Sequence, residues 1–397
     1  MTAEGALAGL KVIDLSRVLA GPLCTQTMGD LGAEVIKVER PGEGDDTRNW
    51  GPPYAGPLSA YFVGVNRNKR SLTLDLGAAE GRAVLDRLIR SGDVLVDNFK
   101  RGTLERWGFD DEWFEANAPG MVHCSITGYG SSGPKADSPG YDFILQAETG
   151  LMAITGEVEG RPMKLGVAIV DICTGMQASI AILAALDARH RTGRGQRCEV
   201  NLHDTGLHLL ANVAANHLVS GEEPGRYGNG HPNIVPYRTY PAADGDLALA
   251  VGNDRQFAVL AAEVGHREWA DDPRFATNPA RVRNRHLVDR MVAEVIVTRT
   301  RAQWVGVFDR VGIPSGPINR VSEALTSQQT RAREMVVETE HSVAGRVRML
   351  GLPIEMSETL PSIRHEPPAL GADTDAVLGE LGYSPEEIAT LRASAVV

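Results

Sequence analysis

The chain has 397 residues, of which 43% are hydrophobic and 23% are charged, and its formal net charge at pH 7 is −11. This length allows two domains with substantial cores, and the composition is that of an ordinary globular protein. The acidic balance argues against nucleic acid as the main partner, and no block of Lys and Arg indicates an anionic membrane surface.

The four cysteines form no C-x-x-C pair and no metal-ligand spacing with histidines, so we expect reduced thiols and no metal site. The first residues, MTAEGALAGLKVIDLSR, lack the basic segment and apolar core of a signal peptide. No apolar stretch is expected to be long enough to span a bilayer. These features predict a soluble, cytoplasmic protein without a membrane partner.

Short apolar runs alternate with helical patterns over the first two hundred residues, which predicts an α/β fold with a mostly parallel sheet and helices on both faces. The expected strands are Lys11–Ser16, Glu34–Glu39, Val94–Val96, Met121–Ile126, Val167–Val170 and Gln196–Leu202. The expected helices are Pro22–Leu31, Ala78–Arg90, Tyr141–Leu151, Asp171–Leu186 and one that opens at Asp204.

The polar, Gly/Pro-rich segment Ser220–Asn233 is typical of a linker between domains. After it, one strand and three helices predict a small α+β unit; they are Leu247–Val251, Phe257–Val264, Leu287–Val297 and Gln303–Val311. The tail returns to short strands near Val343–Leu350, and Ser384, Pro385 and Glu387 form the pattern of a helix-starting capping box.

Asp171 carries the sharpest chemical signal, because it stands between the expected strand Val167–Val170 and the small-residue helix after it. That junction lies at the carboxyl edge of an α/β sheet, where ligands bind and a helix dipole is positive. The alternative is a plain helix N-cap, which spacing alone favours. The motifs around Asp171 favour the functional interpretation.

A dinucleotide site is weakly supported, although Glu39 ends the second strand like a ribose-binding carboxylate. The loop Leu19–Cys24 is not G-x-G-x-x-G, and the chain has no P-loop and no G-x-S-x-G elbow. These gaps argue against a nicotinamide enzyme, a P-loop ATPase and a serine hydrolase.

Several segments, in order along most of the chain, are similar to the class III CoA-transferase family, which includes formyl-CoA transferase, carnitine CoA-transferase and α-methylacyl-CoA racemase. The matching segments are Ala20–Pro22, Gly32–Arg40, Asp46–Arg48, Asn66–Ser71, Asn98–Phe99 with Arg106, Ser125–Gly130, Tyr141–Asp142, Asp171 with Thr174–Gly175, Thr192–Gly195 and Gly312–Ile318. The segment Asn229–Tyr237 most resembles the branch that moves CoA between succinyl-CoA and dicarboxylates such as glutarate.

The resemblance implies that Asp171 is the catalytic aspartate of a CoA-transferase. In the transferases this residue attacks the acyl-CoA thioester to form a mixed anhydride, which the CoA thiolate converts to an aspartyl-CoA thioester. We expect a carboxylate of ordinary pKa, about 4, that is ionised but weakly nucleophilic and therefore depends on placement and exclusion of water. Thr174 and Gly175 are expected to leave room for the acyl group.

The resemblance also implies the CoA contacts, with no permanently bound cofactor and CoA as a substrate. The matching positions are Arg40, Leu74, Leu76, Asn98, Phe99, Arg106 and Tyr141. For a dicarboxylate substrate the candidate contacts are Arg48, whose alternative is an ion pair with Asp45 or Asp46, and, more weakly, His231 and Arg255. Leu19 departs from the glutamine of formyl-CoA transferase, which argues against oxalate and formate.

Two rival functions stay open. The racemases pair the aspartate with a histidine, but this chain has Tyr141 there, a poor proton shuttle at neutral pH. A non-catalytic acyl-CoA-binding protein is the other alternative. By resemblance we expect an interlocked homodimer with a large Rossmann-like domain (1–220), linkers (221–236 and 319–330), a small domain (237–318) and a returning C-terminal segment (331–397).

Overall fold

The computed structural model describes residues 5–397, so the first four residues of the N-terminal segment lie outside the described part. The chain divides into two compact units. The larger one contains the residues up to Leu151, Leu165–Leu210 and Gln329–Val397, and the smaller one contains Met152–Lys164 and Ala211–Gln328.

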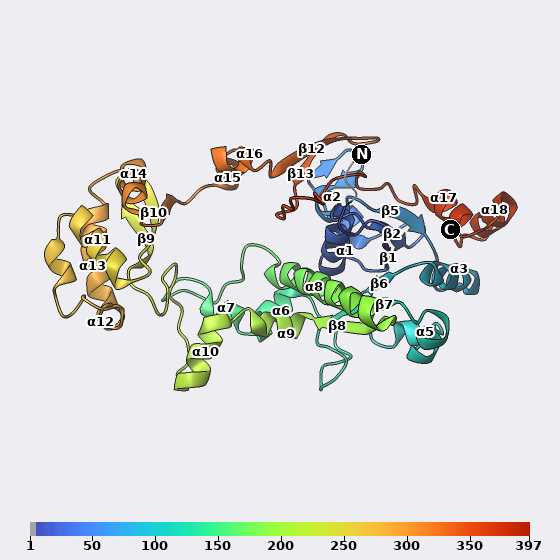
Figure 1. The fold of residues 1–397 in the computed structure, drawn as a ribbon, viewed down its shortest axis with the longest axis horizontal. Coiled ribbons are helices and arrows are strands. Elements are labelled where there is room, and N and C mark those ends of the chain that lie inside the picture. Colours follow the sequence, from blue (N-terminus) through green and yellow to red (C-terminus); the bar gives the residue numbers. More distant parts are fainter. Residues whose placement is uncertain (1–4) are drawn as a thin grey trace. The chain divides into compact units, whose positions relative to one another are not determined.

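A six-stranded parallel sheet forms the centre of the larger unit, which confirms the expected α/β fold (Figure 1). Its strands, in the order β5-β2-β1-β6-β7-β8, are Arg70–Thr73, Glu34–Glu39, Lys11–Asp14, Val94–Asp97, Val122–Thr127 and Arg197–Asn201. Five of the six were expected from apolar runs. β5 was not, because three of its four residues, Arg70, Ser71 and Thr73, are polar.

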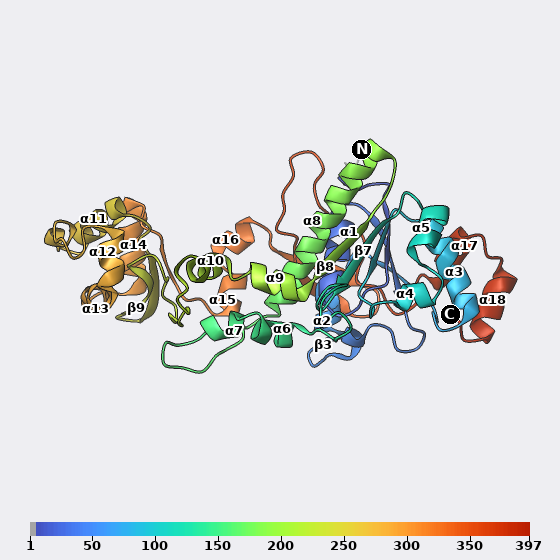
Figure 2. The same cartoon turned by 90° about the horizontal axis from the view of Figure 1, so that it is seen from below.

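Side chains alternate between two apolar layers along the strands. Val12 and Val94 pack with helices α1 (Ala20–Asp30) and α8 (Ile169–Thr192) on one face of the sheet. Ile13 and Leu95 pack on the other face with helices α3, α17 and α18, which span Ala79–Arg90, Thr374–Glu380 and Pro385–Ala393. Figure 2 shows α8 and α3 on opposite sides of the strands. The capping box at Ser384 is confirmed.

The expected strand Val167–Val170 is wrong, because α8 begins at Ile169 and Asp171 is its third residue. A short apolar run is ambiguous between a strand and the first turn of a buried helix. The expectation that no apolar stretch reaches bilayer length is also wrong. α8 has 24 residues and includes a window of mean hydropathy 1.8, 44% of which is buried within the protein, so it is the one helix of residues 5–397 that is long and apolar enough to cross a membrane by length and composition.

The smaller unit has a three-stranded antiparallel sheet in the order β11-β10-β9, formed by Ser315–Pro317, Gly245–Ala250 and Tyr237–Ala242. Its core joins these strands to helices α11, α13 and α14, which span Asp254–Glu263, Arg285–Ile296 and Arg301–Val311. This mixture agrees with the expected α+β character. β9 and β11 were not expected from the sequence.

The remaining elements are short. In the larger unit they are β3 (Tyr54–Ala55), β4 (Leu58–Ser59), α2 (Ala60–Val65), α4 (Thr103–Arg106), α5 (Asp111–Asn117), α6 (Asp142–Glu148), α9 (Leu202–His208), β12 (Val336–His341), β13 (Gly345–Leu350) and a 3₁₀ turn at Asp46–Asn49. The others are α7 (Leu151–Ile154), α10 (Ala211–Ser220), α12 (Asn278–Arg283), α15 (Val321–Leu325), α16 (Gln328–Ala332) and a 3₁₀ turn at Arg267–Ala270.

Candidate active site

Asp171 lines a cavity of about 350 Å³ at the carboxyl edge of the parallel sheet. Much of its wall comes from segments that follow three strands, and the loop before α6 also contributes; the segments are Arg17–Ala20 after β1, Asn98–Arg101 after β6, Ile126–Gly128 at the end of β7 and Ala136–Tyr141. Ligands of open α/β sheets bind at this edge. The structure therefore places Asp171 where a substrate would be expected.

Asp142, at the start of α6, caps the helix that carries Asp171. Its Oδ1 accepts hydrogen bonds from the backbone N–H of Val170 at 2.8 Å and of Asp171 at 3.3 Å, and its Oδ2 accepts one from Gln146 at 2.6 Å. The alternative that Asp171 is itself the N-cap is wrong, because Ala168 occupies that position. The Asp171 side chain is therefore left for chemistry.

The Asp171 carboxyl is less acidic than expected. Burial raises its pKa, and the nearby negative charge of Asp142 raises it further, to about 7. The expectation of an ordinary pKa for Asp171 is wrong, because the fold buries the carboxyl and also brings the like charge of Asp142 close to it. A carboxylate of higher pKa is more basic and hence a stronger nucleophile once ionised.

Helix α8 lies very close to the start of α1. A Cβ atom added to Gly175 would lie 2.5 Å from the carbonyl oxygen of Ala20, so only glycine fits this contact without displacement. One residue earlier, the hydroxyl of Thr174 is buried and, among the described residues, has no hydrogen-bond partner. Gly175 thus serves close packing of α8 against α1, and the expected room for an acyl group stays a prediction.

Tyr61, which sequence analysis missed, lies near both carboxylates. Burial raises the pKa of Tyr61 to about 12, and the charges of Asp171, Asp142 and Asp45 contribute to the increase. The ring is on α2 and makes an edge contact with Trp50, with 5.2 Å between ring centroids. An aromatic residue within the apolar stretch Ala60–Val65 looks like a core residue, so the sequence carried no signal for it.

A second cavity of about 500 Å³ shares Asn98 and Phe99 with the first. Of the seven positions that the family resemblance places on CoA, Arg40, Leu74 and Leu76 line this second cavity. Arg106 and Tyr141 line the cavity that contains Asp171. The seven positions are therefore distributed over two adjoining cavities.

The polar side chains among these seven positions differ in the contacts that they already make within the protein. Arg40 is exposed and paired with Glu43 at 2.7 Å, and Arg106 donates to the hydroxyl of Thr103 at 2.9 Å. Asn98 uses its amide within the protein, as it accepts from the N–H of Arg17 at 3.0 Å and donates to the carbonyl of Arg17 at 2.8 Å. Asn98 therefore supports the loop that forms the Asp171 cavity.

Arg48 does not line either cavity. Its Nη2 lies 2.6 Å from a carboxylate oxygen of Glu39, its Nε donates to the other oxygen at 2.8 Å, and its guanidinium stacks on Phe62 at 3.8 Å. The alternative pairing with Asp45 or Asp46 is wrong, since the partner is Glu39. Glu39, whose position resembled that of a ribose-binding carboxylate, is therefore already engaged in a buried ion pair with Arg48.

His231 and Arg255 lie in the smaller unit. Burial and the charge of Arg285 lower the pKa of His231, whose Nδ1 accepts the N–H of Asn233 at 3.0 Å. Arg255 is exposed on α11. Cations that line the Asp171 cavity, and that sequence analysis missed, are Arg17, Lys100 and Arg101. Residues 5–397 contain no group of three or more His, Cys, Asp or Glu placed to hold a metal ion.

Comparison with known proteins gives a consistent result. Residues 7–374 match CoA-transferase family III. The chain is 43% identical to the succinate–glutarate CoA-transferase of Agrobacterium fabrum, over 94% of this chain and 95% of that protein. It is 40% identical to the succinyl-CoA:glutarate CoA-transferase of Mus musculus, over 98% and 90% of the two chains. A CAIB/BAIF family protein from Brucella suis has a similar solved structure, with a TM-score of 0.83 and 43% identity over 95% of this chain and 100% of that chain.

Proposed function

The chain belongs to CoA-transferase family III and is an enzyme of that class, and we propose that it moves CoA from succinyl-CoA to a short dicarboxylic acid through covalent intermediates on Asp171. The observation that carries this proposal is the placement of Asp171. It lines one cavity with Arg106 and Tyr141, two of the positions implied for CoA.

The proposed reaction begins when a carboxylate oxygen of Asp171 attacks the thioester carbon of the donor. The C–S bond breaks, and CoA leaves as a thiolate while a mixed anhydride forms on Asp171. The thiolate then attacks the Asp171 carbonyl carbon, which releases the donor acid and leaves an aspartyl-CoA thioester. The acceptor carboxylate repeats these two exchanges in reverse, so no water, metal or oxidant enters the balance.

Two features of the site support this chemistry. The raised pKa of Asp171, about 7, gives a basic nucleophile that is still largely ionised slightly above neutral pH. Asp142 fixes the first turn of α8 through two backbone hydrogen bonds, which limits the positions that the Asp171 carboxylate can take. Accurate placement of this kind supplies much of the rate of reactions between two bound groups.

The dicarboxylate acceptor is proposed from the names of the relatives and from the cations at the site. A second carboxylate on the acceptor is costly to bury without a positive partner. Arg17, Lys100 and Arg101 line the Asp171 cavity and are candidates for that partner, whereas the guanidinium of Arg48 is already paired with Glu39. His231 and Arg255 stay proposed contacts from the smaller unit.

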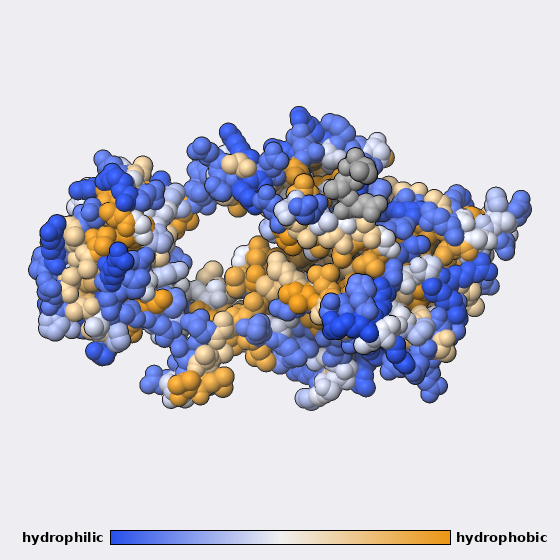
Figure 3. Space-filling view, viewed as in Figure 1, coloured by the Kyte–Doolittle hydropathy of each residue, from blue (hydrophilic) through white to orange (hydrophobic). Residues whose placement is uncertain are grey.

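We propose that the active form is the interlocked homodimer implied by the family. Helix α8 exposes Met176, Ile180 and Leu183 at helical spacing, and each is at least 39% exposed in the single chain. The space-filling view shows apolar surface, in orange, in the region of α8 (Figure 3). A second copy of the chain would remove this surface from water.

A screen of succinyl-CoA against mono- and dicarboxylic acids, with mass detection of each new CoA ester, tests the proposed function. We expect esters of short dicarboxylates to form fastest. Deuterium exchange at the α-carbon of a 2-methylacyl-CoA without any acceptor would favour the racemase, for which this chain has Tyr141, 62% exposed, in place of a histidine. Binding of acyl-CoA without transfer would favour a non-catalytic protein.

A further inference from the structure

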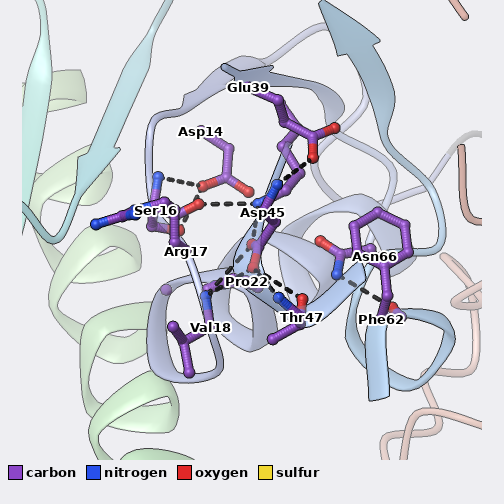
Figure 4. Close-up of polar contacts among 12 residues, drawn as sticks. Asp14, Ser16, Arg17, Val18, Pro22, Glu39, Asp45, Thr47, Phe62 and Asn66 are labelled. Atoms are coloured by element: carbon purple, nitrogen blue, oxygen red, sulfur yellow. Dashed lines mark hydrogen bonds and ion pairs between the residues drawn. The ribbon is translucent and has the colours of Figure 1, made fainter. Parts of the chain in front are cut away.

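Side chains hold the backbone of the loop Ser16–Leu19, which connects β1 to α1 (Figure 4). The N–H of Ser16 donates to Asp14 at 2.9 Å, and the carbonyl of Ser16 accepts from the ammonium of Lys37 at 2.8 Å. The next residue, Arg17, has both backbone groups bonded to Asn98, as described above. The loop is therefore fixed from several strands at once.

Val18 is the strained position of this loop. Its φ is +74°, in the left-handed region that β-branched residues rarely occupy, where such a residue costs about 1–3 kcal/mol. Its N–H donates to both carboxylate oxygens of Asp45, each at 3.3 Å (Figure 4). Strain of this kind persists only where the surroundings impose it.

The Asp45 carboxylate is well suited to impose that conformation. It is fully buried and pairs with Lys37 at 2.9 Å, and Thr47 donates to it through its N–H at 3.0 Å and its hydroxyl at 2.8 Å. Burial raises the pKa of Asp45, but the charge of Lys37 and these bonds outweigh burial and lower it. The carboxylate is therefore ionised and held in place at neutral pH.

The buried ion pairs around Asp45 are not explained by a contribution to the stability of the fold alone. Asp14, Lys37, Asp45 and Lys69 are all buried, with Lys69 3.0 Å from Asp14. Desolvation makes buried ion pairs weak contributors to stability compared with apolar packing, and one use of such groups is to specify a conformation. The conformation specified here is that of a wall of the active site, because Arg17–Ala20 line the Asp171 cavity.

We propose that Asp45 is a positioning residue for CoA transfer, which holds the left-handed backbone of Val18 and so keeps the loop Ser16–Leu19 in place as a wall of the Asp171 cavity. Asp45 lines the adjoining second cavity and not the cavity of Asp171, and its side chain is fully buried. Its removal should let Val18 relax to an ordinary φ and displace Leu19. The inference rests on the proposed function, since the cavity is taken to be the site of transfer.

The test combines Asp45→Asn with substitutions at Val18. We expect Asp45→Asn to lower kcat by about 10- to 100-fold while KM for acyl-CoA changes little, as for other displacements near 1 Å. Adding Val18→Gly to the Asp45→Asn variant should raise kcat again by about tenfold, because glycine adopts a positive φ without strain. Val18→Ala should not restore activity, because it removes the same methyl groups but keeps the Cβ atom.

Thr47→Val is the matched control, since it removes a hydrogen bond to the same carboxylate without touching Val18, and we expect kcat to stay within about threefold. Amide hydrogen exchange of the peptide spanning residues 15–20 gives a readout that needs no activity. Asp45→Asn should speed exchange there, and adding Val18→Gly should slow it again.

Three outcomes would overturn the role of Asp45: an unchanged kcat in Asp45→Asn, rescue by Val18→Ala equal to that by Val18→Gly, or exchange in residues 15–20 that Asp45→Asn does not alter. If the wild-type enzyme transfers CoA to no acid at all, the proposed function fails, and the exchange measurement still decides the role of Asp45.

Discussion

The environment of Asp171 makes its charge depend on pH within the physiological range. Its pKa of about 7 reflects burial first and the carboxylate of Asp142 second. A folded-state pKa above the ordinary value means that ionisation of Asp171 opposes folding. The stability that the protonated form provides is present below about pH 4 and is lost as pH rises towards 7.

Asp171→Asn should therefore stabilise the protein above neutral pH while it abolishes transfer. Asparagine carries no charge, so we expect the free energy of unfolding to exceed that of the wild type by at least about 1 kcal/mol at pH 8. The difference should shrink towards pH 5. Denaturant unfolding at both pH values measures this difference. A variant less stable than the wild type at pH 8 would show that the negative charge of Asp171 does not destabilise the folded protein.

Asp142→Asn should shift the pH dependence of the reaction. Attack needs ionised Asp171, so kcat/KM for the acyl-CoA should rise with pH and level off above about pH 7. Asparagine can still accept the backbone N–H of Val170, but it removes the like charge, and the midpoint should move down by about one pH unit. A midpoint that stays in place would mean that burial alone raises the pKa.

These features of single residues were not predictable from the sequence. Asp171 itself was expected to be the nucleophile, since family motifs surround it, and this role stays a prediction. Asp142, Asp45 and Tyr61 are brought towards the site from positions 29, 126 and 110 residues away from Asp171 in the chain, and each also has an ordinary interpretation as a cap, a surface charge or a core ring. The strain at Val18 depends on tertiary hydrogen bonds that no local pattern reports.

At the scale of elements, the contact between α1 and α8 links the scaffold to the site. α1 follows directly from the loop Ser16–Leu19, and Gly175 of α8 lies against its first residue. Gly175→Ala should push the start of α1 away, destabilise the protein by about 1–3 kcal/mol and lower kcat.

Gly306→Ala is the control for the substitution at Gly175. Gly306 also lies within a helix, α14, but a Cβ atom there meets nothing within 4 Å. It should stabilise the protein by up to about 1 kcal/mol, because alanine is the better helix former. Thermal unfolding and steady-state kinetics measure the stability and kcat of both variants. Equal stability and equal kcat in the two variants would show that α1 and α8 are not in close contact at Gly175.

The elements that were predicted well from the sequence are those whose apolar residues coincide with buried positions. β1, β2, β6 and β7 are short strands that contain β-branched residues and are buried on both faces of the sheet, so they are recognisable as apolar runs. β8 was also expected. The first turn of α8 failed because the apolar Val167–Val170 lies at a helix start. β9 begins with Tyr237, Arg238 and Thr239, three consecutive residues that are exposed or half-buried, so it has no apolar run to detect.

At the scale of the whole molecule, the exposed apolar face of α8 predicts a stable association of two chains. Ile180 is 59% exposed and lies centrally between Met176 and Leu183. Ile180→Glu should prevent dimer formation and leave aggregated protein, whereas dilution of the wild type to nanomolar concentration should yield no monomer. Mass photometry measures both, and a folded, active wild-type monomer would contradict the interlocked dimer.

The α/β class and the family were accessible from sequence because they depend on order and motif along the chain. The interlocked dimer stays a proposal, which rests on the family resemblance and on the exposed apolar face of α8. The sequence of α8 did not indicate a dimer. Buried Ala178 and Ile182 and exposed Met176 and Ile180 are all apolar, so the sequence does not distinguish a helix buried on one side from a helix buried on both sides.

The most direct test of the account is to trap the covalent intermediate. Incubation with succinyl-CoA followed by hydroxylamine or borohydride, with peptide mass spectrometry, should modify Asp171 alone, and Asp171→Ala should show neither the modification nor any transfer. Unmodified Asp171 in an enzyme that turns over, or substantial turnover by Asp171→Ala, would contradict the central claim that this carboxylate carries the acyl group and CoA.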